Sequence, residues 1–348
     1  MSLYLKKQTP SVAQPIPVVQ NNGNFTYNDR QIVHQVETTI QHWQLRNLIS
    51  SPSSHIVALP RHNTIQFYNT KTKEIVKTLD LPFAPMSIDT RYDHVAVAGP
   101  RGLALVRSMD DSWSSDVFNI GPGMNNAIGL SKIDQDVRVT ICNNDHTIHI
   151  YSIPSMKRIT VLELPSAVNH TSVSMDGKFM LATSDTGDVY QYSIHGDQYE
   201  LESTYKVSNE PCLGCAWNSS STMFAVTSQD GQVNVFDVVT QKKLCQLVSS
   251  ETRKTRKAAR CVAFSKGPLD LMIYSEHVSQ VNIVDTRTFD RRQIIRLAPL
   301  DMDAHIAGIT FSPDYRSIFV ALEDNLTELK LDLASRRQFP SATPLSIF

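Results

Sequence analysis

Two residue pairs in this 348-residue chain have the spacing of metal or redox sites. Cys212 and Cys215 form a C-x-x-C pair, and His146 and His149 are also separated by two residues. A structural zinc site requires four ligands, and a redox pair usually lies at the start of a helix. Both pairs instead lie in or beside strand-like alternating runs, where residues three apart point to opposite faces of a sheet. We therefore predict that the cysteines pack in the core and that the chain binds no metal ion and no other cofactor.

A glycine-rich segment is the remaining candidate for chemistry on a small molecule. Gly121-Pro122-Gly123 has the composition of a phosphate-binding loop, but the sequence after it alternates like a strand. A phosphate cradle uses the free amides and the dipole of a helix N-terminus, which a strand does not provide. No Gly-x-Ser-x-Gly or His-Glu-x-x-His motif occurs, and no other motif marks a nucleophile with its base. The sequence predicts a protein that is not an enzyme.

Composition indicates a folded chain without a strong charge preference. Hydrophobic residues make up 41%, charged residues 19%, and the formal net charge is −1. A net charge near zero gives no general attraction to nucleic acid or to an anionic membrane, so we expect neither as a partner. The apolar runs are also too short to span a bilayer. No apolar segment of a secretory signal follows Lys6 and Lys7, and the five cysteines are typical of a reduced intracellular protein. The expected location is the cytoplasm or the nucleus.

A pattern that recurs every 38–47 residues organises most of the chain, close to the roughly 40–45 residues of a four-stranded propeller blade. Short apolar runs end in a small polar turn at seven anchors, which are residues 51, 89, 131, 174, 218, 265 and 312. After each anchor the sequence continues with further strand-like runs separated by polar breaks. The clearest of these runs are 64–69, 148–152, 233–237 and 281–285. Their period-2 alternation of β-branched and aromatic residues is the signature of β-strands.

The repeat resembles that of the WD-repeat family over about residues 40–335. The run at 233–237 ends in Phe236-Asp237, which is similar to the Trp-Asp pair that closes a repeat in this family. A WD repeat supplies four strands, so seven repeats imply seven blades. The resemblance implies an all-β fold, a seven-bladed WD40-type β-propeller.

The ends of the repeat region predict how the ring closes. The seventh unit supplies strands at about 309–312, 317–322 and 326–333, and the sequence that follows is a poor fourth strand. Residues 31–39 alternate well, and we predict that this N-terminal strand completes the seventh blade, because closure removes an unpaired edge. The predicted organisation is a flexible N-terminal tail over 1–30, a propeller over 31–337 and a C-terminal tail over 338–348.

A second resemblance is concentrated in the sixth unit. It covers 260–265, 269–277 and 281–289, ends near Arg292-Gln293, and extends to the loop at 121–128. These segments resemble a short uncharacterised domain found in a group of fungal WD-repeat proteins. Some members of that group act as substrate receptors of the GID ubiquitin ligase and recognise proteins by their N-terminal residue. The resemblance implies such a role, with ubiquitin-ligase subunits as partners.

One face of the predicted ring is rich in acidic and amide residues. In a propeller of this kind, the loops between blades and the turns between second and third strands share one face, and such loops carry binding sites. Carboxylates that converge there suit a cationic group, such as the free N-terminal amine of a peptide. The alternative is that Asp and Asn occur there because they form turns well. The candidate peptide-binding residues are Asp145, Asp185, Asp230, Glu276, Asn125 and Asn126.

One block of positive charge lies in the connection between the fifth and sixth units. This basic loop contains Arg253, Lys254, Arg256, Lys257 and Arg260. Such a run is typical of a solvated loop, but it also suits an acidic or phosphorylated partner, or a nuclear localisation signal.

Two functional hypotheses follow, and both predict proteins or peptides as partners. The first is a non-enzymatic interaction platform that binds peptide N-termini on its acidic face, as a substrate-recognition subunit of a ubiquitin ligase. The second is a general scaffold that assembles a multiprotein complex through its rim and the basic loop.

Overall fold

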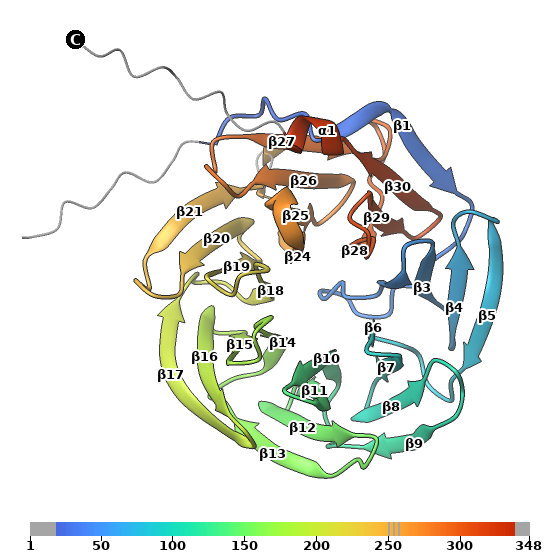
Figure 1. Cartoon of the computed structure of the whole chain (residues 1–348), viewed down its shortest axis with the longest axis vertical. Helices are drawn as coiled ribbons and strands as arrows, with labels where there is room; N and C mark the ends of the chain where they lie inside the picture. The colour runs from blue at the N-terminus through green and yellow to red at the C-terminus, as the bar shows by residue number, and fades with distance from the viewer. Residues whose placement is uncertain (1–18, 250, 253–254, 257, 338–348) are drawn as a thin grey trace, which may run out of the picture.

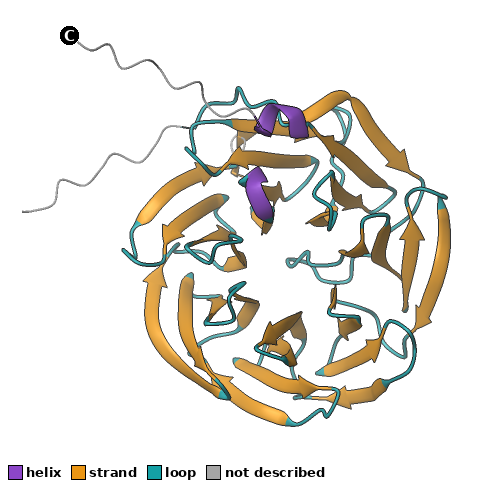
Figure 2. Cartoon of the chain, viewed as in Figure 1, coloured by secondary structure: helices purple, strands orange, loops and turns teal. Residues whose placement is uncertain are grey.

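The computed structural model describes residues 19–249, 251–252, 255–256 and 258–337. Within them, seven four-stranded antiparallel sheets are arranged as blades around a central axis (Figure 1). The two helices of the described chain, η1 (Gly267–Leu269) and α1 (Leu333–Arg337), are short and lie close together at one side of the ring (Figure 2). The prediction of an all-β, seven-bladed propeller is confirmed.

The first three blades each contain four consecutive strands, ordered from the axis to the rim. Blade 1 contains β2 (Ser50–Ser53), β3 (Ile56–Arg61), β4 (Thr64–Asn69) and β5 (Glu74–Asp80). Blade 2 contains β6 (Ser87–Arg91), β7 (His94–Ala98), β8 (Leu103–Ser108) and β9 (Ser114–Asn119). Blade 3 contains β10 (Asn125–Ile133), β11 (Asp136–Asn143), β12 (Thr147–Ile153) and β13 (Arg158–Glu163).

The next three blades repeat this order. Blade 4 contains β14 (Val168–Val173), β15 (Phe179–Ser184), β16 (Asp188–His195) and β17 (Gln198–Lys206). Blade 5 contains β18 (Cys212–Trp217), β19 (Met223–Ser228), β20 (Gln232–Asp237) and β21 (Lys243–Val248). Blade 6 contains β24 (Ala259–Phe264), β25 (Leu271–Glu276), β26 (Gln280–Asp285) and β27 (Arg292–Arg296). A two-stranded hairpin, β22 (Glu251–Thr252) with β23 (Thr255–Arg256), stands in the connection between blades 5 and 6.

The seven sequence anchors mark the ends of the innermost strands. Three anchors, residues 51, 89 and 131, lie two residues before the ends of the strands β2, β6 and β10, and the other four directly follow β14, β18, β24 and β28. The polar anchor is where the chain leaves the axis and turns into the second strand of the blade. The repeat in the sequence therefore arises from the polar turn of each blade as well as from its strands.

The seventh blade combines the two ends of the propeller. Its strands are β28 (Ile306–Phe311), β29 (Ser317–Leu322), β30 (Leu326–Leu331) and, at the rim, β1 (Thr26–His34). β1 is antiparallel to β30, with His34 opposite Leu326. An N-terminal strand therefore closes the ring as predicted. It forms the outer edge of the seventh blade, where it covers β30.

The bounds of the closing strand differ from the prediction of 31–39. β1 begins at Thr26 and ends at His34. Beyond it Val36 and Thr38 are still buried, while Gln35 and Glu37 are exposed. The alternation of residues 31–39 thus arises from alternate burial along an extended chain. Only residues 31–34 are also paired in a sheet.

Part of the predicted N-terminal tail lies against blade 6. Gln20 forms a β-bridge with Arg291, and the Gly23 amide donates to the carbonyl of Arg292 at 2.9 Å. Residues 1–18 and 338–348, which make up the rest of the predicted tails, lie outside the described residues.

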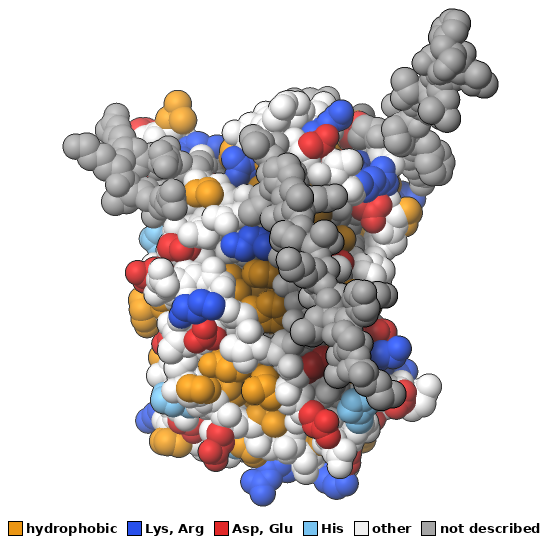
Figure 3. All heavy atoms as spheres, turned by 90° about the vertical axis from the view of Figure 1, so that its left-hand side faces the viewer, with side chains coloured by type: hydrophobic (Ala, Val, Ile, Leu, Met, Phe, Trp, Pro, Cys, Tyr) orange, Lys and Arg blue, Asp and Glu red, His pale blue; other side chains and the backbone are white. Residues whose placement is uncertain are grey.

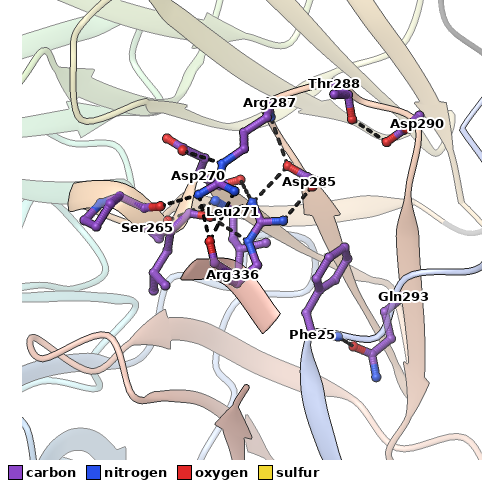
Figure 4. A network of polar contacts seen from close by, with 12 residues as sticks. Phe25, Ser265, Asp270, Leu271, Asp285, Arg287, Thr288, Asp290, Gln293 and Arg336 are labelled. Atoms are coloured by element: carbon purple, nitrogen blue, oxygen red, sulfur yellow. Dashed lines mark hydrogen bonds and ion pairs between the residues drawn. The ribbon is translucent and has the colours of Figure 1, made fainter. Parts of the chain in front are cut away.

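A buried ion pair holds α1 against blade 6. The guanidinium of Arg336 donates to both carboxylate oxygens of Asp285, at 2.5 and 2.9 Å, and to the carbonyl of Leu269 (Figure 4). The same guanidinium lies over the ring of Phe25, 5.4 Å from its centroid. Arg336 therefore joins the helix, blade 6 and the segment that leads into β1.

The hydrophobic cores lie between neighbouring blades. The core between blades 1 and 2, for example, includes Phe67 and Val97, while that between blades 7 and 1 includes Phe319 and Leu59. Because each blade is covered by two neighbours, its middle strands are apolar on both faces. A blade has no core of its own, so stability depends on closing the ring.

Candidate functional site

The connection between β1 and β2 closes one end of the central channel. Residues 39–47, here called the plug, leave blade 7 and run to the middle of the ring, where a blue loop is visible (Figure 1). Backbone hydrogen bonds fix the two ends of the plug. The Thr39 amide donates to the carbonyl of Pro60 in blade 1, and the Asn47 carbonyl accepts from Ile88 in blade 2. The end of the channel that holds the plug is here called the plug face.

Two polar side chains give the plug a compact turn. Nδ1 of His42 accepts from the amides of Gln44 and Leu45, at 3.0 and 2.8 Å. The Arg46 guanidinium donates to the carbonyls of His42, Trp43 and Leu45. Burial, helped by the neighbouring Arg46 cation, lowers the pKa of His42 to about 4. His42 is therefore a neutral hydrogen-bond acceptor at neutral pH, which is the state this turn requires.

Blade 6 anchors the plug from the side. The Arg260 guanidinium donates to the carbonyl of Gln44 at 2.5 Å and to Nδ1 of His277 at 2.9 Å. The thiol of Cys261 donates to the carbonyl of Arg46 at 2.7 Å. Burial, followed by repulsion from Arg46, lowers the pKa of Arg260 to about 10. Two buried arginines, Arg46 of the plug and Arg260 of blade 6, thus direct their donors at backbone carbonyls of the plug.

An exposed tryptophan projects from this fixed turn. The side chain of Trp43 is 73% exposed, although its neighbours Leu45 and Arg46 are buried. Its ring stacks on His42 at an interplanar angle of 16°. Gln44, the next residue, contacts the side chain of Gln229 in the turn before β20. Trp43 therefore lies on the same face as the predicted acidic turns.

The three aspartates of the predicted peptide site lie in turns of the plug face and partly serve those turns. Asp145 accepts hydrogen bonds from the amide and hydroxyl of Thr147. Asp230 accepts from Ser208 and Gln232 side chains at 3.0 and 2.8 Å. Asp185 is exposed and accepts from Asn169. Turn chemistry accounts for much of this acidity, while peptide binding by these carboxylates stays a prediction.

The structure corrects the prediction for the other three members of that site. Glu276 is fully buried and accepts a hydrogen bond from Asn282 at 3.0 Å. Asn125 is also fully buried and bonds to the Leu103 carbonyl, and Asn126 is 2% exposed and bonds to the Val168 carbonyl. These side chains tie neighbouring strands together, so they present no surface to a peptide.

The basic loop is divided by the structure. Arg253, Lys254 and Lys257 lie outside the described residues, and Arg256 belongs to β23. Arg260 is 6% exposed and anchors the plug, so its assignment to a solvated loop was wrong. Arg260 is the second residue of β24, and from there its guanidinium reaches the plug rather than solvent.

The residue pairs with metal or redox spacing are packed in strands. Cys212 and Cys215 are buried, and burial raises the pKa of the Cys212 thiol to about 12. His149 is 9% exposed, while His146 lies in the exposed turn before its strand. Among the residues that the structure describes, no group of three or more His, Cys, Asp and Glu side chains is arranged to hold a metal ion. These thiols are protonated at neutral pH and are poor nucleophiles.

The glycines of the 121–123 loop serve close packing. A Cβ atom at Gly123 would lie 2.1 Å from the side-chain oxygen of Asn143, and one at Gly102 would lie 2.0 Å from the Gly121 carbonyl. Gly102 also has a φ of +70°, in the left-handed region. The loop is followed by the strand β10, as the sequence suggests. Its glycines are required because larger residues would collide with neighbouring atoms.

Sequence reasoning did not find the plug. Its residues have no strand alternation, and its contacts join positions that are far apart, such as Gln44 and Arg260. The one signal in the sequence was the length of the connection between the closing strand and the first inner strand. No helix within the described part of the chain has the length and apolar character that crossing a membrane requires.

Seven four-stranded blades, closed by a strand from the other end of the chain, define a β-propeller of the WD-repeat class. Residues 199–237, from β17 to the end of β20, match the family described as WD domain, G-beta repeat. Residues 257–296, which include all of blade 6, match an uncharacterised protein domain, DUF2415. The resemblance noted in the sixth unit is therefore confirmed.

Relatives of this chain occur in two yeasts. An uncharacterised protein of Schizosaccharomyces pombe is 29% identical over 330 residues, which cover 88% of this chain and 93% of that protein. An uncharacterised protein of Saccharomyces cerevisiae is 24% identical over 220 residues, which cover 51% of this chain and 30% of that protein. The chain is a WD-repeat propeller of a kind found in fungi.

Proposed function

We propose that this propeller is a non-catalytic platform that captures partner proteins on its plug face, as the substrate-recognition subunit of a ubiquitin ligase. The observation that carries the proposal is the exposed side chain of Trp43. Tryptophan is strongly enriched among the residues that dominate binding energy in protein interfaces. An exposed tryptophan costs free energy in water, and here it is held out by a turn with buried polar anchors.

The rigidity of the plug supports a binding role. Arg46 and Arg260 fix the backbone on both sides of Trp43, so a partner would meet a preformed contact and lose little loop entropy on binding. A connection that served only to link two strands would not need two buried arginines. Burying a guanidinium is expensive unless its donors are used.

The charge around Trp43 favours a cationic partner group. Asp230 follows Gln229, whose side chain contacts Gln44 of the plug. Asp185 and Asp145 lie in the equivalent turns of blades 4 and 3. A peptide N-terminus places an ammonium group next to a first side chain, which suits a face that carries both carboxylates and an exposed aromatic ring. The ligase role itself rests on the resemblance of blade 6 to a domain of fungal WD-repeat proteins, some of which act as ligase receptors.

Peptides displayed with free N-termini test this proposal. Peptides selected on the purified propeller are measured again with acetylated N-termini, and against Trp43→Ala and Asp230→Asn variants. We expect acetylation and Trp43→Ala each to weaken binding at least about tenfold, equivalent to about 1.4 kcal/mol. Val239→Ala is the matched control, because Val239 is 86% exposed but lies in the turn between β20 and β21.

The outcomes separate the parts of the proposal. Equal binding of acetylated peptides would exclude recognition of the amine, and unchanged binding by Trp43→Ala would exclude the plug face. If bound proteins are ligase substrates, Trp43→Ala should also slow their ubiquitylation in cells. Unchanged ubiquitylation would contradict the ligase role alone.

The second candidate is a scaffold that acts through its rim and the basic loop. It is favoured by the β22–β23 hairpin, which is an addition to the four-stranded plan between blades 5 and 6. On the side of the ring seen in Figure 3, acidic and basic side chains alternate and apolar side chains form patches between them. Replacing residues 253–257 with a Gly-Ser linker should remove partners in this case, and leave them unchanged if the plug face carries binding.

A further inference from the structure

A cavity of about 490 Å³ lies on the propeller axis, at the end opposite the plug. The later halves of the inner strands line it, and Asn47, the last residue of the plug, reaches it from the other side. Ligand sites for small organic molecules usually measure about 300–1,000 Å³. The cavity therefore has the size of a small-molecule site and is separated from the plug face.

The charged residues that line this cavity are mainly basic. Arg91 and Lys266 reach it from blades 2 and 6, and Asp89 is the one carboxylate in its lining. Both oxygens of Asp89 are already engaged, because Arg91 Nε donates to Oδ1 at 3.0 Å and the Leu130 amide donates to Oδ2 at 2.7 Å. The described residues give the Lys266 ammonium no hydrogen bond and no ion pair. Lys266 is exposed at the mouth of the cavity, and partial desolvation there, followed by repulsion from Arg91, lowers its pKa. The cavity thus has a surplus of positive charge.

Uncharged donors complete the lining. The Cys215 amide donates to Nδ1 of His170, so the imidazole proton lies on Nε2, and burial lowers the pKa of this histidine to about 4. The hydroxyls of Ser131 and Thr140 have no hydrogen-bond partner among the described residues, although these side chains are only 6% and 3% exposed. Buried hydroxyls without a protein partner are uncommon and need an acceptor. Both line the cavity.

We propose that the axial cavity binds a small organic phosphate, held by Arg91, Lys266 and the hydroxyls of Ser131 and Thr140. A phosphate has several acceptor oxygens in tetrahedral directions, so it suits donors that reach a cavity from different blades. The volume exceeds what inorganic phosphate fills, and Tyr92, Met175 and Phe264 in the lining offer apolar contact to an organic group. The site is independent of the plug face and of the proposed function.

Calorimetric titration with phenyl phosphate tests the site. Phenyl phosphate combines a dianion with a ring, while phenol and inorganic phosphate supply each part alone. We expect saturable binding of phenyl phosphate, weaker binding of inorganic phosphate and no binding of phenol. Lys266→Met should weaken phenyl phosphate binding about tenfold or more. Lys178→Met is the matched control, because Lys178 is exposed in the turn between β14 and β15, at the same end of the ring but outside the cavity lining.

Thr140→Val supplies a test with a separate stability readout. The valine keeps the shape of threonine and removes a hydroxyl that has no protein partner. We expect several-fold weaker binding with a melting temperature that does not fall. Absence of saturable phenyl phosphate binding, or binding that Lys266→Met leaves unchanged, would overturn the proposal. Binding of a phosphoserine peptide without binding of phenyl phosphate would also overturn it, in favour of a peptide site.

Discussion

The guanidinium of Arg260 donates a hydrogen bond of 2.5 Å to the carbonyl of Gln44, which lies 216 positions earlier in the chain. This bond joins the start of blade 6 to the turn that holds Trp43. It therefore connects the blade that carries the family resemblance with the surface that we propose to bind partners. The hydrogen bond fixes the plug as an integral part of the propeller fold.

Removing this anchor should destabilise the protein. Arg260→Met keeps much of the side-chain volume but leaves the Gln44 carbonyl without its buried donor, which costs about 1–3 kcal/mol. Urea unfolding measures the loss. Arg316→Met is the control, because the Arg316 side chain is 74% exposed and its ion pair with Asp314 is long, at 3.9 Å. Equal effects of the two variants would show that Arg260 does not hold the plug.

The junction of α1 with blade 6 yields a second prediction. Asp285→Asn removes the charge that faces Arg336, and both side chains are buried. Breaking a buried ion pair leaves an uncompensated charge, so we expect a loss of about 3–5 kcal/mol in the free energy of unfolding. Hydrogen exchange should show faster opening of β1, since Arg336 also covers Phe25. Unchanged exchange in β1 would show that α1 does not secure the closing strand.

The stability of the plug should depend on pH through His42. Its pKa in the folded protein is about 4 against 6.5 for the free side chain, so the unfolded chain binds the proton first as the pH falls. Folding stability is then lost between about pH 6.5 and pH 4, with about 2 kcal/mol lost from His42 between pH 7 and pH 5. Unfolding experiments at these two pH values measure the difference.

A non-titrating variant isolates this contribution. His42→Asn retains a side-chain acceptor for the amides of Gln44 and Leu45 and cannot be protonated in this range. The loss of stability from pH 7 to pH 5 should therefore be smaller in the variant than in the parent. An equal loss in both proteins would assign the pH dependence to other groups, such as His170, whose pKa is also lowered to about 4 by burial.

Trp43→Ala should leave folding almost unchanged. The side chain is mostly exposed, and the contacts that define the plug come from the backbone and from His42 and Arg46. We expect a change in unfolding free energy within about 0.5 kcal/mol, as for other surface substitutions. A loss of more than about 2 kcal/mol would assign Trp43 a structural role instead.

The blades were predictable because their physics is local and repeated. In runs such as 233–237, successive side chains point to opposite neighbouring blades, so that Val233 and Val235 pack in the core shared with blade 6 and Phe236 packs in the core shared with blade 4. The anchors follow from turn chemistry. The closing strand was found for the same reason. Its bounds were not, because Val36 and Thr38 are buried alternately although they lie beyond the end of β1.

The site was less predictable because its contacts are not local. Acidic turn residues such as Asp230 could be placed on one face from the repeat alone. Arg260 resembles its neighbours in a basic run, and only its position at the start of β24 shows that it enters the channel. Glu276 resembles the other carboxylates in the same way, yet it is fully buried. Residue type does not distinguish a buried charge from an exposed one.

Site-specific photo-crosslinking tests the central claim most directly. A photoreactive phenylalanine analogue replaces Trp43 in the full chain within cells, and the same analogue replaces Val239 in a matched chain. We expect crosslinks to partner proteins from position 43 that are absent from position 239 and disappear when Asp230→Asn is added. Crosslinks of equal pattern from both positions, or from position 239 alone, would contradict the assignment of partner binding to the plug face.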